Sequence, residues 1–211
     1  MCRKFTYLVS FVLLLGAVLN TAAEAADPSL VGWWKLDDAS GTTAIDSSGN
    51  NNNGTLINGP VWAAGYLDGA LQFDGTNDYV DCGNGSSLHI TGSVTITAWV
   101  KLAALGGDQK VGGNQDGTTG GYKMGIYSDN TLEFEIRTSG GSAILNRGVA
   151  GGTVLTQGVW YHVAGVYSQG NYIRTYVNGK PERNYPTAEI LGASSGTFKL
   201  GCEPFTTNGS L

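Results

Sequence analysis

Short runs in which apolar and polar residues alternate recur along the chain, and Gly, Asn, Asp or Ser bounds each run. In Val94–Lys101, VTITAWVK, every second residue is apolar, which places these side chains on one face of a strand. Thr131–Arg137, TLEFEIR, alternates too, with Glu133 and Glu135 predicted to face solvent. Helical periodicity is nearly absent after residue 25. The pattern therefore predicts an all-β sandwich of two antiparallel sheets.

One hairpin is predicted with its turn. The run Tyr172–Val177 leads into Asn178-Gly179, a two-residue turn signal, and Lys180 starts the return strand. The further strand candidates are Val31–Leu36, Ala70–Phe73, Tyr79–Cys82, Tyr122–Tyr127, Ala143–Asn146, Trp160–Tyr167 and Phe198–Gly201. Ten or more short strands without helices between them favour two stacked sheets over any mixed fold.

An amide-rich stretch, AIDSSGNNNNGTL at residues 44–56, interrupts this pattern. The sequence on both sides belongs to strand-like pieces of one core, which argues against a linker. Asn tolerates left-handed backbone and its side chain bonds nearby amides, so such a run can form a compact, ordered loop.

The first 25 residues have the layout of a signal peptide. Arg3 and Lys4 precede an apolar run from Phe5 to Leu19, and Ala23–Ala25 supplies an A-x-A cleavage site. The run is shorter than the roughly 20 residues of a membrane span, and an uncleaved anchor is the alternative. We expect an exported protein, secreted or at the cell surface, with no membrane span after cleavage.

The amino-acid composition limits the kinds of partner that the protein is expected to bind. The 211 residues include 12 basic and 17 acidic side chains, a net charge of −5. An acidic chain lacks the cations that replace phosphate counterions, which argues against nucleic acid and anionic membranes as partners. With 33 glycines and only 14% charged residues, tight turns are expected to be frequent. The remaining length suits one domain, residues 26–211.

Two cysteines, Cys82 and Cys202, remain after processing. In an oxidising compartment such a pair can close into a disulfide. Two buried free thiols are the alternative, and the sequence leaves both open.

Six segments, taken together and in this order, resemble the laminin-G-like jelly-roll domains of the concanavalin A-like lectin/glucanase superfamily: WWKLDD with DSSGNNNNGTL, GALQFDGTNDYVDCG, SVTITAWVKL, VWYHVAGVYS and IRTYVNGKP. The resemblance runs from Val31 to about Gly201. It implies a jelly-roll module of secreted or surface proteins, linked to sugar binding or adhesion and often holding a structural calcium.

One departure from the family concerns the C-terminal end. Family members continue into a closing strand with a further aspartate, whereas this sequence stops at Leu211. Residues 26–211 are therefore expected to be a C-terminally truncated domain of a larger extracellular protein. Without that strand, backbone groups would stay unpaired, and poor solubility is expected.

The amide-rich stretch also offers ligands for calcium, which takes six to eight oxygens from carboxylates, amides and carbonyls. The candidates lie close together in sequence: Asp37, Asp38, Asp46, Ser48, Asn50 and Asn52. Asp46 is the strongest single candidate, because few other charges surround it. The alternative is a loop closed by Asx-turns without metal.

The resemblance suggests further ligand positions. Related pentraxins bind through calcium held by similarly placed loops, which makes Asn114, Asp116 and Glu203 candidates for a second site.

Tyr122 and Tyr127, near a glycine-rich loop, are candidates for stacking on a sugar. The five tryptophans sit in strand patterns and are predicted to belong mostly to the core.

Catalytic signals are few. Glucanases of this fold carry an E-x-D-x-x-E pattern, and Glu133-Phe-Glu135 supplies only two acids, without the third. Residues 192–196 match G-x-S-x-G by letter but lead into a strand, not a helix. We therefore predict a non-catalytic module for a carbohydrate or an extracellular protein ligand. A glycoside hydrolase of the same fold and a purely structural domain are the alternatives.

Overall fold

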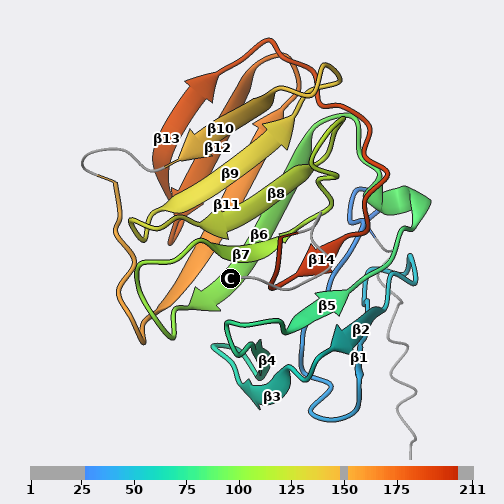
Figure 1. Ribbon diagram of the computed structural model, residues 1–211, viewed down its shortest axis with the longest axis vertical. Helices are drawn as coiled ribbons and strands as arrows, with labels where there is room; N and C mark the ends of the chain where they lie inside the picture. Colours follow the sequence, from blue (N-terminus) through green and yellow to red (C-terminus); the bar gives the residue numbers. More distant parts are fainter. Residues whose placement is uncertain (1–26, 148–151, 204–211) are drawn as a thin grey trace, which may run out of the picture.

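The alternating runs of the sequence form antiparallel strands that build two facing sheets. The computed structural model describes residues 27–147 and 152–203, and the predicted signal peptide, residues 1–25, lies outside them. In Figure 1 the larger sheet lies in front of the smaller one, and a short hairpin lies below both.

The larger sheet has eight strands in the order β1-β2-β5-β14-β7-β8-β9-β10. Their bounds, in that order, are Thr43–Ala44, Gly54–Ile57, Tyr79–Asp81, Lys199–Leu200, Gln109–Gly113, Tyr122–Ile126, Leu132–Arg137 and Ala143–Arg147. The segment joining β13 to β14 brings the chain back into the middle of this sheet, so β14 pairs with both β5 and β7.

The smaller sheet has four strands in the order β13-β12-β11-β6. Their bounds, in that order, are Lys180–Pro186, Tyr172–Val177, Trp160–Ser168 and Val94–Lys101. A separate hairpin joins β3, Val61–Ala64, to β4, Gly69–Gln72, and a 3-10 turn spans Ser86–Leu88. Residues 27–147 and 152–203 contain no helix of the length and apolarity that a membrane span requires.

The core lies between the two sheets. In β9, the apolar residues Phe134 and Ile136 are fully buried. They belong to the same core cluster as Val163 of β11 and Ile173 of β12, which face inward from the other sheet. Gly165 of β11 leaves room for the Phe134 ring. The predicted inward set of β9, Leu132, Phe134 and Ile136, is therefore confirmed.

Several strand predictions are confirmed closely. β6 and β12 have the predicted bounds, and the turn between β12 and β13 is left-handed at both Asn178 (φ 49°) and Gly179 (φ 76°), as the Asn-Gly signal requires. β7 was not predicted, because two glycines in QKVGG weaken its pattern.

The predicted strand Val31–Leu36 is wrong. This segment makes only an isolated bridge between Trp34 and Asp46, and Leu36 is left-handed with φ 60°, which ends any extended run. Trp34 instead anchors the segment, because its ring stacks on Phe198 with centroids 5.3 Å apart and its Nε1 donates to Asn52 O at 2.8 Å.

The predicted disulfide is not formed: Cys82 and Cys202 are buried free thiols, the alternative that the sequence left open. Their positions in the β5–β14 pair give the reason. Lys199 lies opposite Asp81 and Leu200 opposite Val80, so the cysteines follow opposite ends of the pairing. Continuing this register separates them by four positions, roughly 13 Å of strand. A disulfide requires Cα atoms within about 7 Å.

Candidate functional site

The outer face of the eight-stranded sheet carries charged residues. They alternate along the strands with the apolar residues that face the core. In β8 and β9, Lys123 lies directly opposite Glu135 in the strand register. Its Nζ is 3.3 Å from Glu135 Oε2, and Glu135 Oε1 is 3.5 Å from Arg137 Nη2. The Gln115 amide also donates to Glu135 Oε1 at 2.8 Å. One carboxylate therefore joins donors from β8, β9 and the β7–β8 loop.

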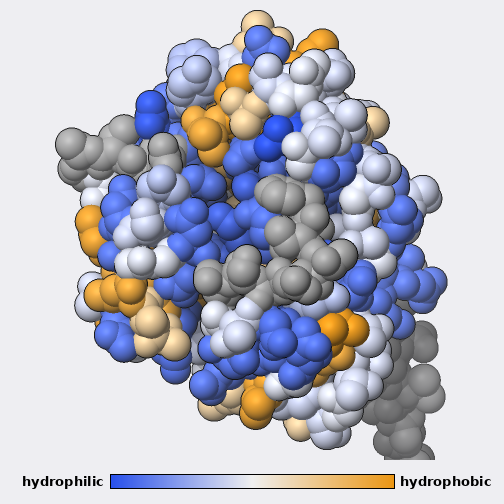
Figure 2. All heavy atoms as spheres, viewed as in Figure 1, coloured by the Kyte–Doolittle hydropathy of each residue, from blue (hydrophilic) through white to orange (hydrophobic). Residues whose placement is uncertain are grey.

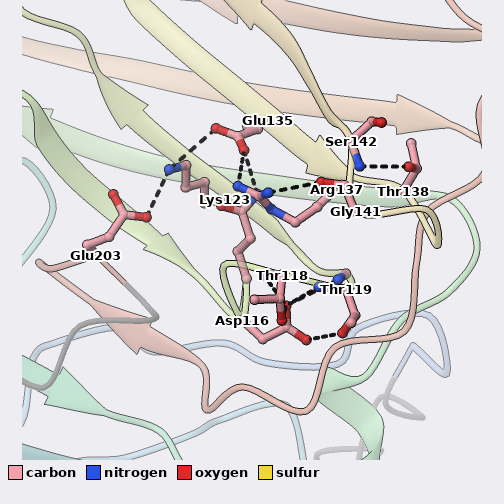
Figure 3. Close-up of polar contacts among 12 residues, drawn as sticks. Asp116, Thr118, Thr119, Lys123, Glu135, Arg137, Thr138, Gly141, Ser142 and Glu203 are labelled. Carbon is pink, nitrogen blue, oxygen red and sulfur yellow. Dashed lines mark hydrogen bonds and ion pairs between the residues drawn. The ribbon is translucent and has the colours of Figure 1, made fainter.

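Glu203 extends this arrangement toward β7. Its Oε1 accepts a hydrogen bond from Lys123 Nζ at 2.8 Å, and its Oε2 lies 3.4 Å from Lys110 Nζ. We call these six residues the charge cluster: Lys110, Gln115, Lys123, Glu135, Arg137 and Glu203. Figure 3 shows Lys123 between the two glutamates, with Arg137 on the far side of Glu135. Hydrophilic residues gather over the same part of the sheet in Figure 2.

The charge cluster is largely removed from water. Burial by itself would lower the pKa of Lys123, but the hydrogen bond to Glu203 and the charge of Glu135 outweigh it and raise that pKa. Glu133 and Glu135 were predicted to face solvent, and this is wrong, since they are only 6% and 5% exposed. They do lie on the outer face, where Lys123, Arg137 and Gln115 surround the Glu135 carboxylate.

Within residues 27–147 and 152–203, two buried polar atoms of the cluster have no hydrogen-bond partner: Gln115 Oε1 and Arg137 Nε. Buried polar groups are nearly always paired, so each such atom calls for a bridging water or a ligand. The Arg137 side chain keeps 19% exposure and donates through Nη1 to Gly141 O at 3.0 Å, in the turn after β9. The cluster thus has one free acceptor, on Gln115, and one free donor, which belongs to the partly exposed Arg137 guanidinium; both atoms are buried.

The β7–β8 loop beside the cluster is fixed by Asp116. Burial alone would raise the pKa of Asp116, but hydrogen bonds from Thr119, Thr118 and Gly120 lower it well below its usual range. The Thr119 hydroxyl donates to its Oδ2 at 2.6 Å. Asp116 is therefore a loop-closing residue whose oxygens are occupied by protein donors.

The predicted second ligand set does not converge on one point. Asn114 is buried, donates to Leu88 O at 2.7 Å and accepts from Tyr122 N at 3.2 Å, while Asp116 closes its own loop. Glu203 belongs to the charge cluster instead. In the part of the chain that the structure describes, no group of three or more His, Cys, Asp and Glu residues is arranged to hold a metal.

The predicted calcium residues form the loop around Asp46, which is ordered as expected. Asp46 Oδ1 accepts from Trp33 N and Ser48 N, and Oδ2 accepts from the Ser48 hydroxyl and Asn52 N, all within 2.9 Å. Burial would raise the pKa of Asp46, but these bonds lower it.

The other predicted ligands are also engaged with the protein. Asn50 and Asn52 turn amide groups to the carbonyls of Leu30 and Val31, and Asp37 pairs with Lys35. Asp38 accepts from Ile45 N. The oxygens of Asp46 are thus already satisfied by N–H and O–H donors, and the loop as it lies does not fit a calcium ion. It fits the alternative of Asx-turns without metal.

Of the two tyrosines predicted to stack on a sugar, only one lies where it can do so. Tyr122 is buried, its hydroxyl donates to Leu88 O at 3.0 Å, and burial raises its pKa, so its ring cannot stack on a sugar from this position. Tyr127 is half-buried just after β8 and stays a candidate. Trp34 and Trp62 pack against the core as predicted.

Trp99 and Trp160, in contrast, lie on the outer face of the four-stranded sheet, at positions that alternate with the buried ones. The strand alternation of 94–101 would have placed Trp99 there, and its aromatic character obscured that signal.

A family model for the concanavalin A-like lectin/glucanases superfamily matches residues 74–211, more than half of the chain. The protein therefore belongs to this superfamily, and its jelly-roll sandwich is the fold expected of a member. No curated protein matches the sequence.

Solved structures with the same fold share little sequence with the chain. The binding domain of Paraclostridial Mosquitocidal Protein 1 is 17% identical, with a TM-score of 0.62 over 79% of this chain and 45% of that one. The ligand-binding domain of botulinum neurotoxin serotype D, in complex with N-acetylneuraminic acid, is 12% identical, with a TM-score of 0.58 over 75% of this chain and 40% of that one. The chain thus spans less than half of these two structures.

A third similar structure is domain 4 of AbnA, an extracellular GH43 arabinanase from Geobacillus stearothermophilus, in complex with arabinotriose. It is 17% identical, with a TM-score of 0.58 over 74% of this chain and 76% of that one. At these identities the likeness shows the fold alone.

Proposed function

We propose that this protein is an extracellular, non-catalytic carbohydrate-binding module that takes its glycan at the charge cluster on the outer face of the eight-stranded sheet. The observation that carries the proposal is the pair of unpartnered atoms there, the Arg137 Nε donor and the Gln115 Oε1 acceptor. A sugar hydroxyl both donates and accepts hydrogen bonds, so it satisfies a donor and an acceptor together. Charged partners make these bonds stronger than neutral ones.

Further support comes from the similar folds. Two of the three structures described above hold a sugar, N-acetylneuraminic acid in one and arabinotriose in the other. Export rests on the predicted signal peptide, residues 1–25. N-terminal sequencing of the exported protein tests that part of the proposal, and an N-terminus at Ala26 is expected.

A binding role suits the cluster better than catalysis. Glycoside hydrolysis requires one carboxylic acid to protonate the leaving group and a second carboxylate on the other side of the bond. Glu135 is instead paired with two cations and an amide. Its charge is neutralised by fixed partners, which is the arrangement of a positioning group.

The test is a glycan array of neutral sugars followed by titration of the best binder. Arg137→Lys keeps the charge but removes Nε, and we expect affinity to fall roughly tenfold or more, the value of one charge-assisted hydrogen bond. Arg183→Lys, on β13 of the opposite sheet, is the matched control and should bind normally. Release of reducing sugar that is abolished by Glu133→Gln or Glu135→Gln would replace the proposal with a hydrolase. A blank array without turnover would leave a structural domain.

A further inference from the structure

The outer face of the four-stranded sheet carries a second group of surface residues, unrelated to the charge cluster and on the opposite side of the sandwich. Alternation in β6, β11 and β12 buries one set of residues in the core and leaves the other set facing outward. The outward set is rich in aromatic rings: Trp99, Trp160, His162, Tyr172 and Tyr176.

At one end of this face the rings form a packed group. Tyr66, from the β3–β4 turn, stacks on Trp99 with ring centroids 3.6 Å apart and an interplanar angle of 15°. Trp99 in turn meets His162 edge-on, with centroids 5.4 Å apart. Tyr66 is 53% exposed and Trp99 37%, so this stack is held in place and still open to solvent. Lys101 Nζ lies 5.0 Å from the centroid of the neighbouring Trp160.

At the other end a fixed arginine projects from β12. The guanidinium carbon of Arg174 lies 4.5 Å from the Tyr172 ring centroid, Nη1 donates to the Tyr176 hydroxyl at 3.3 Å, and Nε donates to Asn184 Oδ1 at 3.3 Å. These bonds engage two of the five N–H donors of a guanidinium and leave the others for a ligand. A guanidinium already held in position loses less entropy when it binds a carboxylate bidentately.

The face is also free of acidic residues along its strands. β6, β11 and β12 contain no Asp or Glu, although the protein has a net charge of −5. On the edge strand β13, Glu182 is turned aside, because its carboxylate accepts from Thr153 N at 2.6 Å and from the Thr153 hydroxyl at 2.7 Å. Asp68 shares a turn with Tyr66 but lines a shallow depression with Leu36 and Trp62. β6, β11 and β12 thus present two cations, Lys101 and Arg174, and no acidic side chain.

We infer that this face binds an acidic polysaccharide bearing one carboxylate per sugar, such as a uronate polymer, along the direction of the strands. Lys101 and Arg174 lie six positions apart in the β11 register, opposite Trp160 and Val166, which is about 20 Å of strand. Two cations at this separation pair with two different carboxylates of one extended polysaccharide chain. The negative electron density of aromatic faces suits the C–H groups of sugar rings between them. A densely sulfated chain fits less well, because the acidic protein would repel its unneutralised charge.

Titration of the protein with polygalacturonate at low ionic strength tests this inference, with neutral dextran and dextran sulfate as comparison polymers. We expect binding to polygalacturonate that weakens at least tenfold in Arg174→Gln and in Trp99→Ala, and less in Arg174→Lys. Lys35→Gln is the matched control, since Lys35 Nζ also lies over a ring, 5.8 Å from the Trp33 centroid, in a different part of the molecule. Its affinity should equal that of the wild type.

Three outcomes would overturn the inference: no binding to polygalacturonate, equal losses in Arg174→Gln and Lys35→Gln, or tighter binding to dextran sulfate. Arg174 is accessible on the surface, so its variants should keep the wild-type melting temperature, and that measurement accompanies each titration. The two sites are titrated with different ligands, polygalacturonate here and a neutral glycan at the charge cluster. Failure here therefore leaves the charge-cluster proposal standing, and failure there leaves this one standing.

Discussion

Gly165 of β11 lies directly beneath the ring of Phe134 of β9, at the centre of the contact between the two sheets. A Cβ atom added to Gly165 would sit 2.2 Å from Phe134 Cδ2 and 2.4 Å from Cγ. Phe134 is fully buried, so its ring has no free space into which it can move. The absence of a side chain at position 165 therefore sets how closely the sheets approach.

Gly165→Ala is expected to lower the free energy of unfolding by about 1–3 kcal/mol, because the added methyl group overpacks the core. Urea unfolding followed by tryptophan fluorescence measures the change. Gly107→Ala is the control, since a Cβ there meets nothing within 4 Å, and its effect should stay within about 0.5 kcal/mol. Equal stability of the two variants would show that the sheets separate easily at this point.

The two free thiols give a second prediction. Burial raises the pKa of Cys202 to about 11, and burial also raises the pKa of Cys82. At pH 8 both are therefore protonated and shielded from reagents. We expect a thiol-specific dye to react only as the protein unfolds in urea, and the melting temperature to be the same with and without a reductant. A lower melting temperature in reductant would mean that a disulfide forms after all.

The sequence predicted most of the strands and little of the site, for a physical reason. The alternation of buried and outward residues within β6 or β9 is a local property of each strand. It assigns even Trp99 to the correct, outward face if the position in the strand is used and the apolar character of the side chain is ignored. Pairing between strands is not local. The burial of Glu135 depends on Lys123 lying opposite it and on Glu203 returning from 68 positions further along the chain.

The loop around Asp46 shows the same limit. Its residues were correctly predicted to form an ordered loop, since Asx-type bonds are local. The sequence could not show whether the oxygens point to a cation or to backbone N–H groups. That choice depends on Trp33 and Asn52 meeting Asp46 from different segments.

Calcium removal tests this loop. Because four protein donors occupy the Asp46 carboxylate, we expect excess EDTA to leave the melting temperature unchanged. Asp46→Asn should destabilise the protein by about 2–4 kcal/mol, since its amide NH₂ cannot accept the bonds that one oxygen accepts now. Asp38→Asn, where the half-buried carboxylate accepts one long, exposed bond of 3.3 Å, is the control and should have little effect. A melting temperature that falls in EDTA would support the calcium prediction from sequence.

The same carboxylates make stability depend on pH. The pKa values of Asp46 and Asp116 are lower in the folded protein than the ordinary value of 3.8, so the folded state binds fewer protons than the unfolded state around that pH. Their contribution to stability is therefore fully present above pH 4–5 and is lost as the pH falls through the folded-state pKa values. Urea midpoints measured between pH 7 and pH 2.5 should decrease steadily below pH 4. In Asp46→Asn this decrease should be smaller, and an unchanged pH dependence would contradict the assignment.

The edges of the four-stranded sheet differ in how well they resist pairing with other strands. At one edge, β13 carries Lys180, Pro181 and Pro186, which are typical of protected edge strands. At the other edge, β6 has β11 as its one strand partner within the described residues, and its sequence VTITAWVK has one charge, at its end. A strand so rich in β-branched residues and so low in charge favours pairing with another copy of itself.

We therefore expect the protein to self-associate through β6. Thr97→Lys places a charge at the exposed centre of the strand, where two antiparallel copies would bring like charges together, and it should shift the protein toward monomer. Thr91→Lys adds the same charge in the loop before β6 and should not. Sedimentation velocity over a hundredfold concentration range measures the difference. A wild-type protein that stays monomeric throughout, or equal behaviour of the two variants, would show that this edge is protected by another part of the chain.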